Sequence, residues 1–269
     1  MGSRPVVVTM TDGPSHDEIA SDLYEAYESG TPISPVRMER DLTVSEAYAI
    51  QSDVVDRRTE TEGSRVGYKV GFTSAAIRDE MEIQEPAYGH VLAGTVRSEG
   101  HVDVGPLVQP KVEAELAFRF GDPVKPPATG ADVLSATSAV VPAVEIVDSR
   151  IEDWDVTAPE AIADNALSGL VVLGDVARDP TALDVDLALV GVELRRNGVR
   201  RATGVGADVL GHPATVVEWL AGALEERGAA LAAGDLVLTG SMTPLVPLEP
   251  GDAVEVRFAD FGTLSVHGR

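Results

Sequence analysis

Three glutamates in two separate segments are the side chains best suited to chemistry in this sequence. Glu113 and Glu115 alternate with apolar residues in KVEAELAF, so on a strand they share one face. Glu145 follows in the apolar run AVVPAVEIV, which is typical of a strand covered on both faces. Burying a lone carboxylate there costs several kcal/mol unless a cation compensates. Three converging carboxylates therefore predict a site for a hard divalent cation, Mg²⁺ or Mn²⁺.

A plainer interpretation stays open, in which Glu113 and Glu115 line a solvated sheet face of an acidic protein. The chain has no cysteine, which excludes disulfides, zinc–thiolate sites, iron–sulfur clusters and thiol nucleophiles. The histidines show no ligand-like spacing, which argues against a histidine-rich metal site. They are His16, His90, His101, His212 and His267. Any metal site is therefore expected to use oxygen ligands.

Lys69 stands between two glycines on one face of a predicted strand, in the segment VGYKVGF. Glycine inside a strand often marks the close approach of a ligand or of another backbone. The sequence has only three lysines, so an ammonium at this position is a candidate to hold an anionic substrate. The alternative is a lysine that snorkels from a glycine-rich sheet edge.

Two polar segments at predicted strand ends complete the candidate set. Asp164 and Asn165 precede the apolar segment SGLVVLG, and Ser241 follows the predicted strand at residues 236–238. Hydroxyls and backbone N–H groups in such turns could hold a carboxylate, although both segments are also ordinary turn chemistry. Asp164 and Ser241 therefore join Lys69 as candidate catalytic residues.

The elements that must position these side chains change character along the chain. Residues 15–30 and 43–58 carry apolar side chains at helical spacing, behind Ser15 and a Thr43-x-x-Glu46 capping box, and so predict two amphipathic helices. From residue 66 the apolar period shortens to two, with Gly and Pro between segments, which predicts strands. One further helix is expected within HPATVVEWLAGALEERGAAL.

Strands thus dominate without a regular βαβ alternation. This pattern argues against a Rossmann or TIM-type fold and predicts an α+β protein built on a curled, mixed sheet. We expect an N-terminal helical cap over residues 1–62 and one continuous catalytic domain over residues 63–269.

Composition limits the partners and the compartment. The 269-residue chain is 44% hydrophobic, with no apolar run near the ~18 residues of a membrane-spanning helix. Its formal net charge of −23 disfavours nucleic acid as a partner. The apolar stretch at the N-terminus is too short for a signal peptide, and the residues after it are acidic. We therefore expect a cytoplasmic protein. The acidic excess suggests adaptation to a salt-rich cytosol, with an ordinary acidic protein as the alternative.

Several blocks, in order along residues 15–268, resemble the fumarylacetoacetate hydrolase superfamily, and within it the 2-keto-4-pentenoate hydratase and 4-oxalocrotonate decarboxylase branch. The blocks are GYKVGFTSAAI, EPAYGHVLAGT, QPKVEAELAF, VVPAVEIVDSRIEDW, ADNALSG and GDLVLTGSMTP. Several such blocks in one order are far more specific than any one of them.

The resemblance implies a mixed β-roll with an N-terminal helical cap, and a homo-oligomer. It implies that Mg²⁺ or Mn²⁺ is bound by Glu113, Glu115 and Glu145, while Lys69 orients a 2-oxo or 2-hydroxydienoate substrate or assists proton transfer. The segment QEPAYG departs from the family, which often has an acidic residue at the position of Ala87, so the contacts to the distal end of the substrate are left open.

The activity that the resemblance favours is a metal-dependent hydratase of 2-hydroxy-2,4-dienoates, yielding 4-hydroxy-2-oxo acids in the meta-cleavage route of aromatic breakdown. Three alternatives remain at this point. They are a 2-oxo-3-enedioate (4-oxalocrotonate) decarboxylase, an acylpyruvate hydrolase of the same superfamily, and a catalytically silent assembly subunit. The intact acidic trio and Lys69 argue against the silent subunit, because it has no need of a buried, mutually repelling cluster.

Overall fold

The computed structural model describes residues 13–35, 41–98 and 100–269. The first residues, on which the signal-peptide argument depends, lie outside these ranges. Within them, no helix combines the length and the apolarity needed to cross a membrane.

The helices include all three that the sequence predicts. Ser15 and Thr43 each cap a helix through a complete capping box, in which the hydroxyl accepts from the backbone of the third helical residue. The helices are α1 (His16–Ser29), α2 (Val44–Glu62), α3 (Ala75–Glu80), α4 (Gly130–Ala136), α5 (Ala158–Ala163) and α6 (Pro213–Glu225). The short helices α3, α4 and α5 were not predicted, because six or seven residues are too few to display a helical period.

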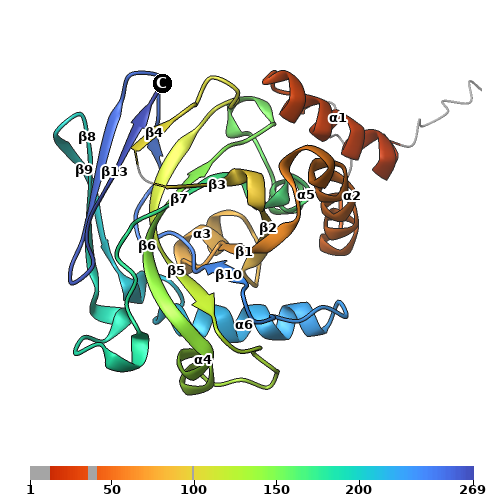
Figure 1. The fold of residues 1–269 in the computed structure, drawn as a ribbon. Helices are drawn as coiled ribbons and strands as arrows, with labels where there is room; N and C mark the ends of the chain where they lie inside the picture. Colours follow the sequence, from red (N-terminus) through yellow and green to blue (C-terminus); the bar gives the residue numbers. More distant parts are fainter. Residues whose placement is uncertain (1–12, 36–40, 99) are drawn as a thin grey trace, which may run out of the picture.

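The strands form two mixed sheets, which confirms the predicted α+β class with a mixed sheet (Figure 1). The larger has the order β2-β1-β10-β5-β6-β7-β3, with β11 also paired to β5, and the smaller has the order β4-β13-β12-β8-β9. The strands are β1 (Arg65–Gly71), β2 (Ala87–Leu92), β3 (Val96–Ser98), β4 (Gly100–Val102), β5 (Lys111–Phe120), β6 (Thr137–Val147), β7 (Ser168–Leu173), β8 (Gly191–Arg196), β9 (Val199–Val205), β10 (Leu236–Leu238), β11 (Val246–Pro247), β12 (Ala253–Phe258) and β13 (Gly262–Gly268).

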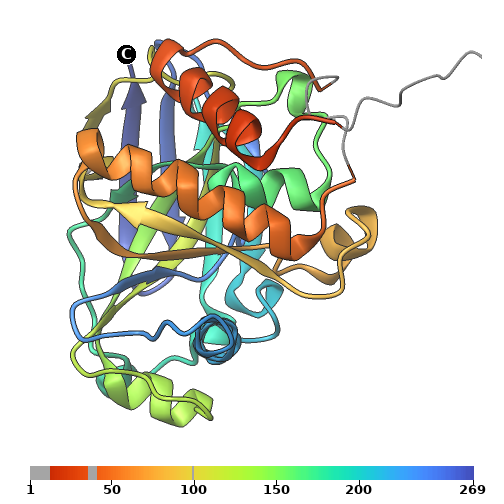
Figure 2. The same cartoon turned by 90° about the vertical axis from the view of Figure 1, so that its right-hand side faces the viewer.

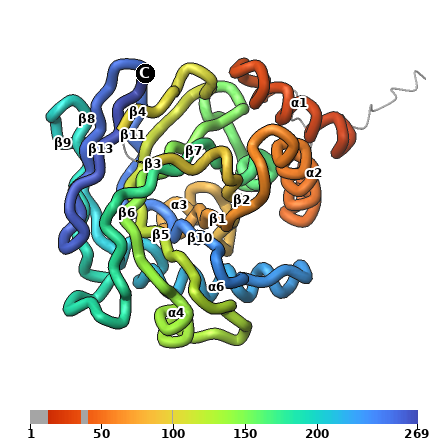
Figure 3. Tube along the Cα trace, in the orientation of Figure 1, coloured from red at the N-terminus to blue at the C-terminus, as the bar shows by residue number. Residues whose placement is uncertain are grey.

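The main core lies between the two sheets. Val112, Ala114, Leu116 and Phe118 of β5 are fully buried in the same apolar cluster as residues from β8, β12 and β13. The predicted alternation along β5 is therefore confirmed, and it turns the two glutamates of this strand away from the second sheet. In the tube view, β5 and β6 run side by side at the centre of the molecule, between the smaller sheet and the helical side (Figure 3).

The two N-terminal helices lie together on one side of the larger sheet, with α2 next to β2 (Figure 2). Gln51 of α2 is buried, and its amide donates to the carbonyl oxygens of Tyr88 in β2 and Ile162 in α5 at 2.9 and 2.8 Å. The helical cap is thus hydrogen-bonded to the strands and helix beneath it, while its boundary at residue 62 stays a prediction.

Candidate active site

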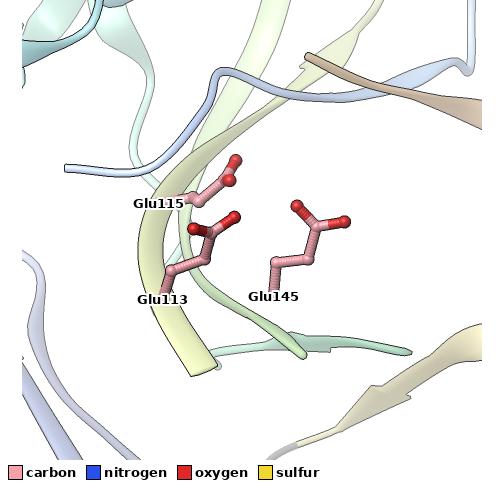
Figure 4. A group of neighbouring side chains, drawn as sticks. All are labelled: Glu113, Glu115 and Glu145. Atoms are coloured by element: carbon pink, nitrogen blue, oxygen red, sulfur yellow. The ribbon is translucent and has the colours of Figure 1, made fainter. Parts of the chain in front are cut away.

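The three glutamates meet on the face of the larger sheet that points away from the main core. Glu113 lies directly opposite Glu145 in the antiparallel pairing of β5 and β6, and Glu115 follows two residues along β5. One carboxylate oxygen from each lies within 4.8 Å of the other two. Figure 4 shows the three carboxylates pointing into the same space. Glu115 and Glu145 are completely buried and Glu113 is 8% exposed, so the solvated-face interpretation does not describe this structure.

Burial and mutual repulsion both disfavour charge on this trio. Burial, helped by the charge of Glu145, raises the pKa of Glu113 to about 7. The pKa of Glu115 is raised well above its ordinary value by burial and by the two neighbouring carboxylates. Burial also raises the pKa of Glu145, against the opposing effect of Lys69. A bound cation would offset the cost of ionising these three buried carboxylates.

The donor set fits a divalent cation. Glu115 Oε1 and Glu145 Oε1 are buried, and among the described residues neither accepts a hydrogen bond. The three carboxylates each offer an oxygen within 4.8 Å of the other two, and oxygen is the ligand type that Mg²⁺ and Mn²⁺ prefer. Three ionised carboxylates and one ammonium leave a net charge of −2, which a divalent ion would cancel.

Lys69 is buried against the acidic trio rather than exposed at a sheet edge. Its Nζ lies 3.1 Å from Glu145 Oε2 and donates to Ala166 O at 2.9 Å, and the side chain is 3% exposed. Burial alone would lower the pKa of Lys69, but the three carboxylates, Glu145 foremost, raise it above its ordinary value. The flanking Gly71 leaves space beside Nζ, because a Cβ there would lie 3.9 Å from it. A charged ammonium therefore borders the carboxylates.

The segment containing Ser241 runs along β5 beside the glutamates. Gly240 N donates to Glu115 Oε2 at 2.9 Å, and the nearby Ser241 hydroxyl opposes the rise in the pKa of Glu113. The Ser241 hydroxyl also bonds Thr243, donating to its carbonyl oxygen at 2.5 Å and accepting from its N–H at 3.2 Å. Gly240 has φ 90°, and a Cβ would lie 2.5 Å from Thr73 Oγ1, so this close packing requires glycine. Ser241 thus lies beside the trio, and its neighbour Gly240 holds Glu115.

Asp164 occupies a different position, beneath the site. It is fully buried and forms an ion pair with Arg150, whose Nε lies 2.6 Å from Asp164 Oδ1 and whose N–H donates to Oδ2 at 2.9 Å. Arg150 also lies 3.9 Å from the ring centre of Tyr27. Burial raises the pKa of Asp164 to about 6, with Arg150 opposing that shift. The structure therefore brings Lys69, Ser241 and the glutamates together and places Asp164 in a supporting ion pair.

Sequence reasoning missed two groups, one at this site and one in the supporting ion pair. Ala166 contributes a backbone carbonyl, which leaves no trace in residue type. Arg150 lies in the acidic stretch VDSRIEDW, where an arginine is normally solvated, yet it is fully buried. The apolar residues before this stretch were the only available signal that the chain is still inside the core there.

Comparison with known proteins adds independent findings. A family model described as fumarylacetoacetate (FAA) hydrolase, C-terminal, matches residues 69–267. The chain is 41% identical over 255 residues to the 2-keto-4-pentenoate hydratase of Paraburkholderia xenovorans (strain LB400), covering 92% of this chain and 93% of that protein. It is 39% identical over 232 residues to the 4-oxalocrotonate decarboxylase of Pseudomonas sp. (strain CF600), covering 85% and 86%.

A solved structure matches nearly the whole fold. The 4-oxalocrotonate decarboxylase of Pseudomonas putida G7, complexed with magnesium and adipate, superposes with a TM-score of 0.88 at 32% identity, covering 96% of this chain and 100% of that one.

Proposed function

The chain belongs to the fumarylacetoacetate hydrolase family of enzymes, and from this premise we propose that it is a divalent-metal-dependent hydratase of 2-hydroxy-2,4-dienoates. The product would be a 4-hydroxy-2-oxo acid. The observation that carries the proposal is the buried meeting of Glu113, Glu115 and Glu145 with the Lys69 ammonium, in a chain similar to 2-keto-4-pentenoate hydratases along most of its length.

Glu113, Glu115 and Glu145 are the residues that would hold Mg²⁺ or Mn²⁺. When bound, the ion supplies a Lewis acid that stabilises negative charge on the C2 oxygen of the substrate. Gly240 N–H keeps the Glu115 carboxylate in place, because it donates to Oε2 at 2.9 Å, and Ser241 lies beside Glu113. Side chains held in this way need no reorganisation when charge develops on the substrate.

Lys69 would stabilise the anionic substrate from the side of Glu145. Its ammonium has three N–H donors; one points to Ala166 O and Glu145 lies within ion-pair distance of the same nitrogen. A remaining donor can bond the substrate oxygen or assist proton transfer. Because burial removes water, this charge-assisted contact strengthens as the oxygen becomes more negative.

The reaction then proceeds in two balanced steps. In the first, the C2 hydroxyl loses its proton and C5 gains one, so the dienol becomes an α,β-unsaturated ketone. In the second, water adds across C3 and C4, with its hydroxyl on C4 and its proton on C3. Lys69 faces the oxygen that carries the charge in both steps.

A decarboxylase of 2-oxo-3-enedioates is the second candidate. The match to a 4-oxalocrotonate decarboxylase with a TM-score of 0.88 favours it. The electron pair released as CO₂ leaves would pass through the conjugated chain of the substrate to its C2 oxygen, where the same groups would stabilise the negative charge. The similarity to hydratases at 41% identity, against 39% for the decarboxylase relative, supports the hydratase as the first choice.

One experiment separates these activities. The purified protein is given 2-hydroxypenta-2,4-dienoate or 2-oxo-3-hexenedioate, with Mg²⁺, Mn²⁺ or a chelator, while dienol absorbance is followed and CO₂ is trapped. We expect metal-dependent loss of the dienol without CO₂, and formation of the 4-hydroxy-2-oxo acid. Release of CO₂ from the enedioate, without turnover of the dienoate, would assign the decarboxylase. No turnover of either compound would contradict both proposed activities.

The proposal extends to the oligomeric state and the cellular location of the enzyme. We infer a cytoplasmic homo-oligomer. The oligomer is supported by the larger sheet, which ends in the short edge strand β3 and in β2, because open sheet edges are commonly covered. The net charge of −23 supports a protein adapted to high salt, where screening reduces self-repulsion.

A further inference from the structure

Three consecutive non-glycine residues adopt the left-handed conformation directly beside Lys69. Asn165, Ala166 and Leu167 have φ of 50°, 50° and 61°. Such a conformation costs each residue of order 1 kcal/mol or more, so a run of three persists only when its surroundings hold it. The turn lies between α5 and β7, and it presents Ala166 O to the Lys69 ammonium at 2.9 Å.

The Asn165 side chain bonds this turn to β2, which pairs with β1, the strand that contains Lys69. Asn165 Oδ1 accepts from His90 N at 2.7 Å and Asn165 Nδ2 donates to His90 O at 2.9 Å, so the amide bonds β2 as a neighbouring strand would. Asn165 is completely buried. Gly89, which pairs with Lys69, makes this approach possible, since a Cβ there would lie 2.3 Å from Asn165 O.

We propose that Asn165 is a positioning residue for Lys69. The C=O and NH₂ groups of its side-chain amide both bond β2, and this keeps Ala166 O in its place. Ala166 O in turn fixes the Lys69 ammonium between the turn and Glu145. The inference rests on the proposed function, in which Lys69 contacts the substrate. Without the fixed carbonyl, the ammonium could swing toward the carboxylates, and its free donor would lose its direction toward the reacting oxygen.

The chain supplies a matched control, because it contains only two asparagines. Asn197 is also left-handed, with φ 54°, and its amide likewise bridges two groups, Asp252 Oδ1 at 2.7 Å and Ala253 N at 2.9 Å. It lies between β8 and β9 in the smaller sheet. Asn165→Gly and Asn197→Gly therefore both remove a bridging amide while keeping a left-handed backbone accessible.

The first measurement is kinetic, with metal affinity and melting temperature recorded in parallel. We expect Asn165→Gly to lower kcat at least about tenfold, with KM within about threefold and Mg²⁺ affinity by calorimetry unchanged. Asn197→Gly should leave kcat, KM and the Mg²⁺ affinity near their wild-type values. If Asn165→Gly does not fold, Asn165→Asp keeps the acceptor toward His90 N and replaces the donor toward His90 O by an acceptor oxygen that repels it, and the same loss of kcat is expected.

The second measurement observes Lys69 without substrate. Protein labelled with ¹³C at lysine Cε has three signals, from Lys69, Lys111 and Lys125, and Lys69→Met assigns the first. We expect the Lys69 signal to shift or broaden in Asn165→Gly and not in Asn197→Gly. Wild-type kcat, or an unmoved Lys69 signal, in Asn165→Gly would overturn the proposal. Because the spectrum needs no turnover, failure of the proposed hydratase activity would be recognised separately.

Discussion

Replacing Glu115 by Gln should stabilise the metal-free protein and weaken its binding of Mg²⁺. Both effects come from one lost charge, but they have opposite signs. Glu115 is completely buried, and its Oε1 accepts no hydrogen bond among the described residues. Gln is nearly isosteric and can still accept the 2.9 Å hydrogen bond from Gly240 N, so the packing should survive.

The size of each effect follows from the geometry. Two unit charges 4.8 Å apart repel by about 3.5 kcal/mol at an effective dielectric constant of 20. Proton uptake already relieves part of this repulsion, because the pKa of Glu115 is raised well above its ordinary value. We therefore expect a gain of about 1–3 kcal/mol in the free energy of unfolding without metal. Losing one of three anionic ligands should weaken Mg²⁺ binding about 100-fold or more, about 2.8 kcal/mol.

The assay pairs denaturant unfolding in a chelator with calorimetric titration of Mg²⁺. Glu255→Gln is the control, because it changes the net charge equally on β12 in the other sheet, where Glu255 pairs with Arg257. It should alter neither quantity appreciably. Mg²⁺ affinity equal to wild type in Glu115→Gln, or a metal-free protein destabilised by more than about 1 kcal/mol, would refute the assignment of Glu115 as a ligand in a repelling cluster.

Three further predictions test other parts of the molecule. Lys69→Met should lower kcat about 100-fold or more, with a smaller change in KM and with metal retained; a change below about threefold would make Lys69 a scaffold residue. Burial lowers the pKa of His90 to about 4, so the stability gained by keeping it neutral is complete above about pH 6.5 and is lost as pH falls toward 4. His90→Phe should therefore lose less free energy of unfolding than wild type between pH 7 and pH 5, and equal losses would exclude this origin. Sedimentation in concentrated salt should show a homo-oligomer, and a monomer would contradict that prediction. The melting temperature should fall on dilution from molar salt to about 0.01 M, where the Debye length grows from about 3 Å to about 30 Å, and constant melting would contradict the salt adaptation.

The candidate site could be predicted from sequence where a charged residue lies within a clear strand pattern. Glu113 and Glu115 share a face because a strand alternates, and the apolar surroundings of Glu145 indicated its burial. The pairing of Glu113 with Glu145 was not predictable, because register depends on how β5 and β6 are connected through α4. The α+β class followed from the same periodicities, while the division into two sheets depends on long-range pairing.

Asp164 illustrates a different limit. Its position before a strand suggested a role at the site, but sequence contains no sign that Arg150 would reach it across the turn. The same segment holds the Ala166 carbonyl, which acts through backbone conformation alone. Positions set by left-handed residues are poorly predicted, because the residue types Ala and Leu argue against that conformation.

The contact between Arg150 and Tyr27 has a consequence for how the protein unfolds. Arg58 of α2 lies 3.7 Å from the Tyr27 ring centre, Arg150 lies 3.9 Å from it, and Tyr27 OH donates to Ser168 O at 2.7 Å. Detaching α1 would expose the buried Arg150 guanidinium and remove the hydrogen bond to Ser168, which follows the turn that contacts Lys69. We therefore expect the cap and the sheet to melt in one cooperative transition rather than as separate modules.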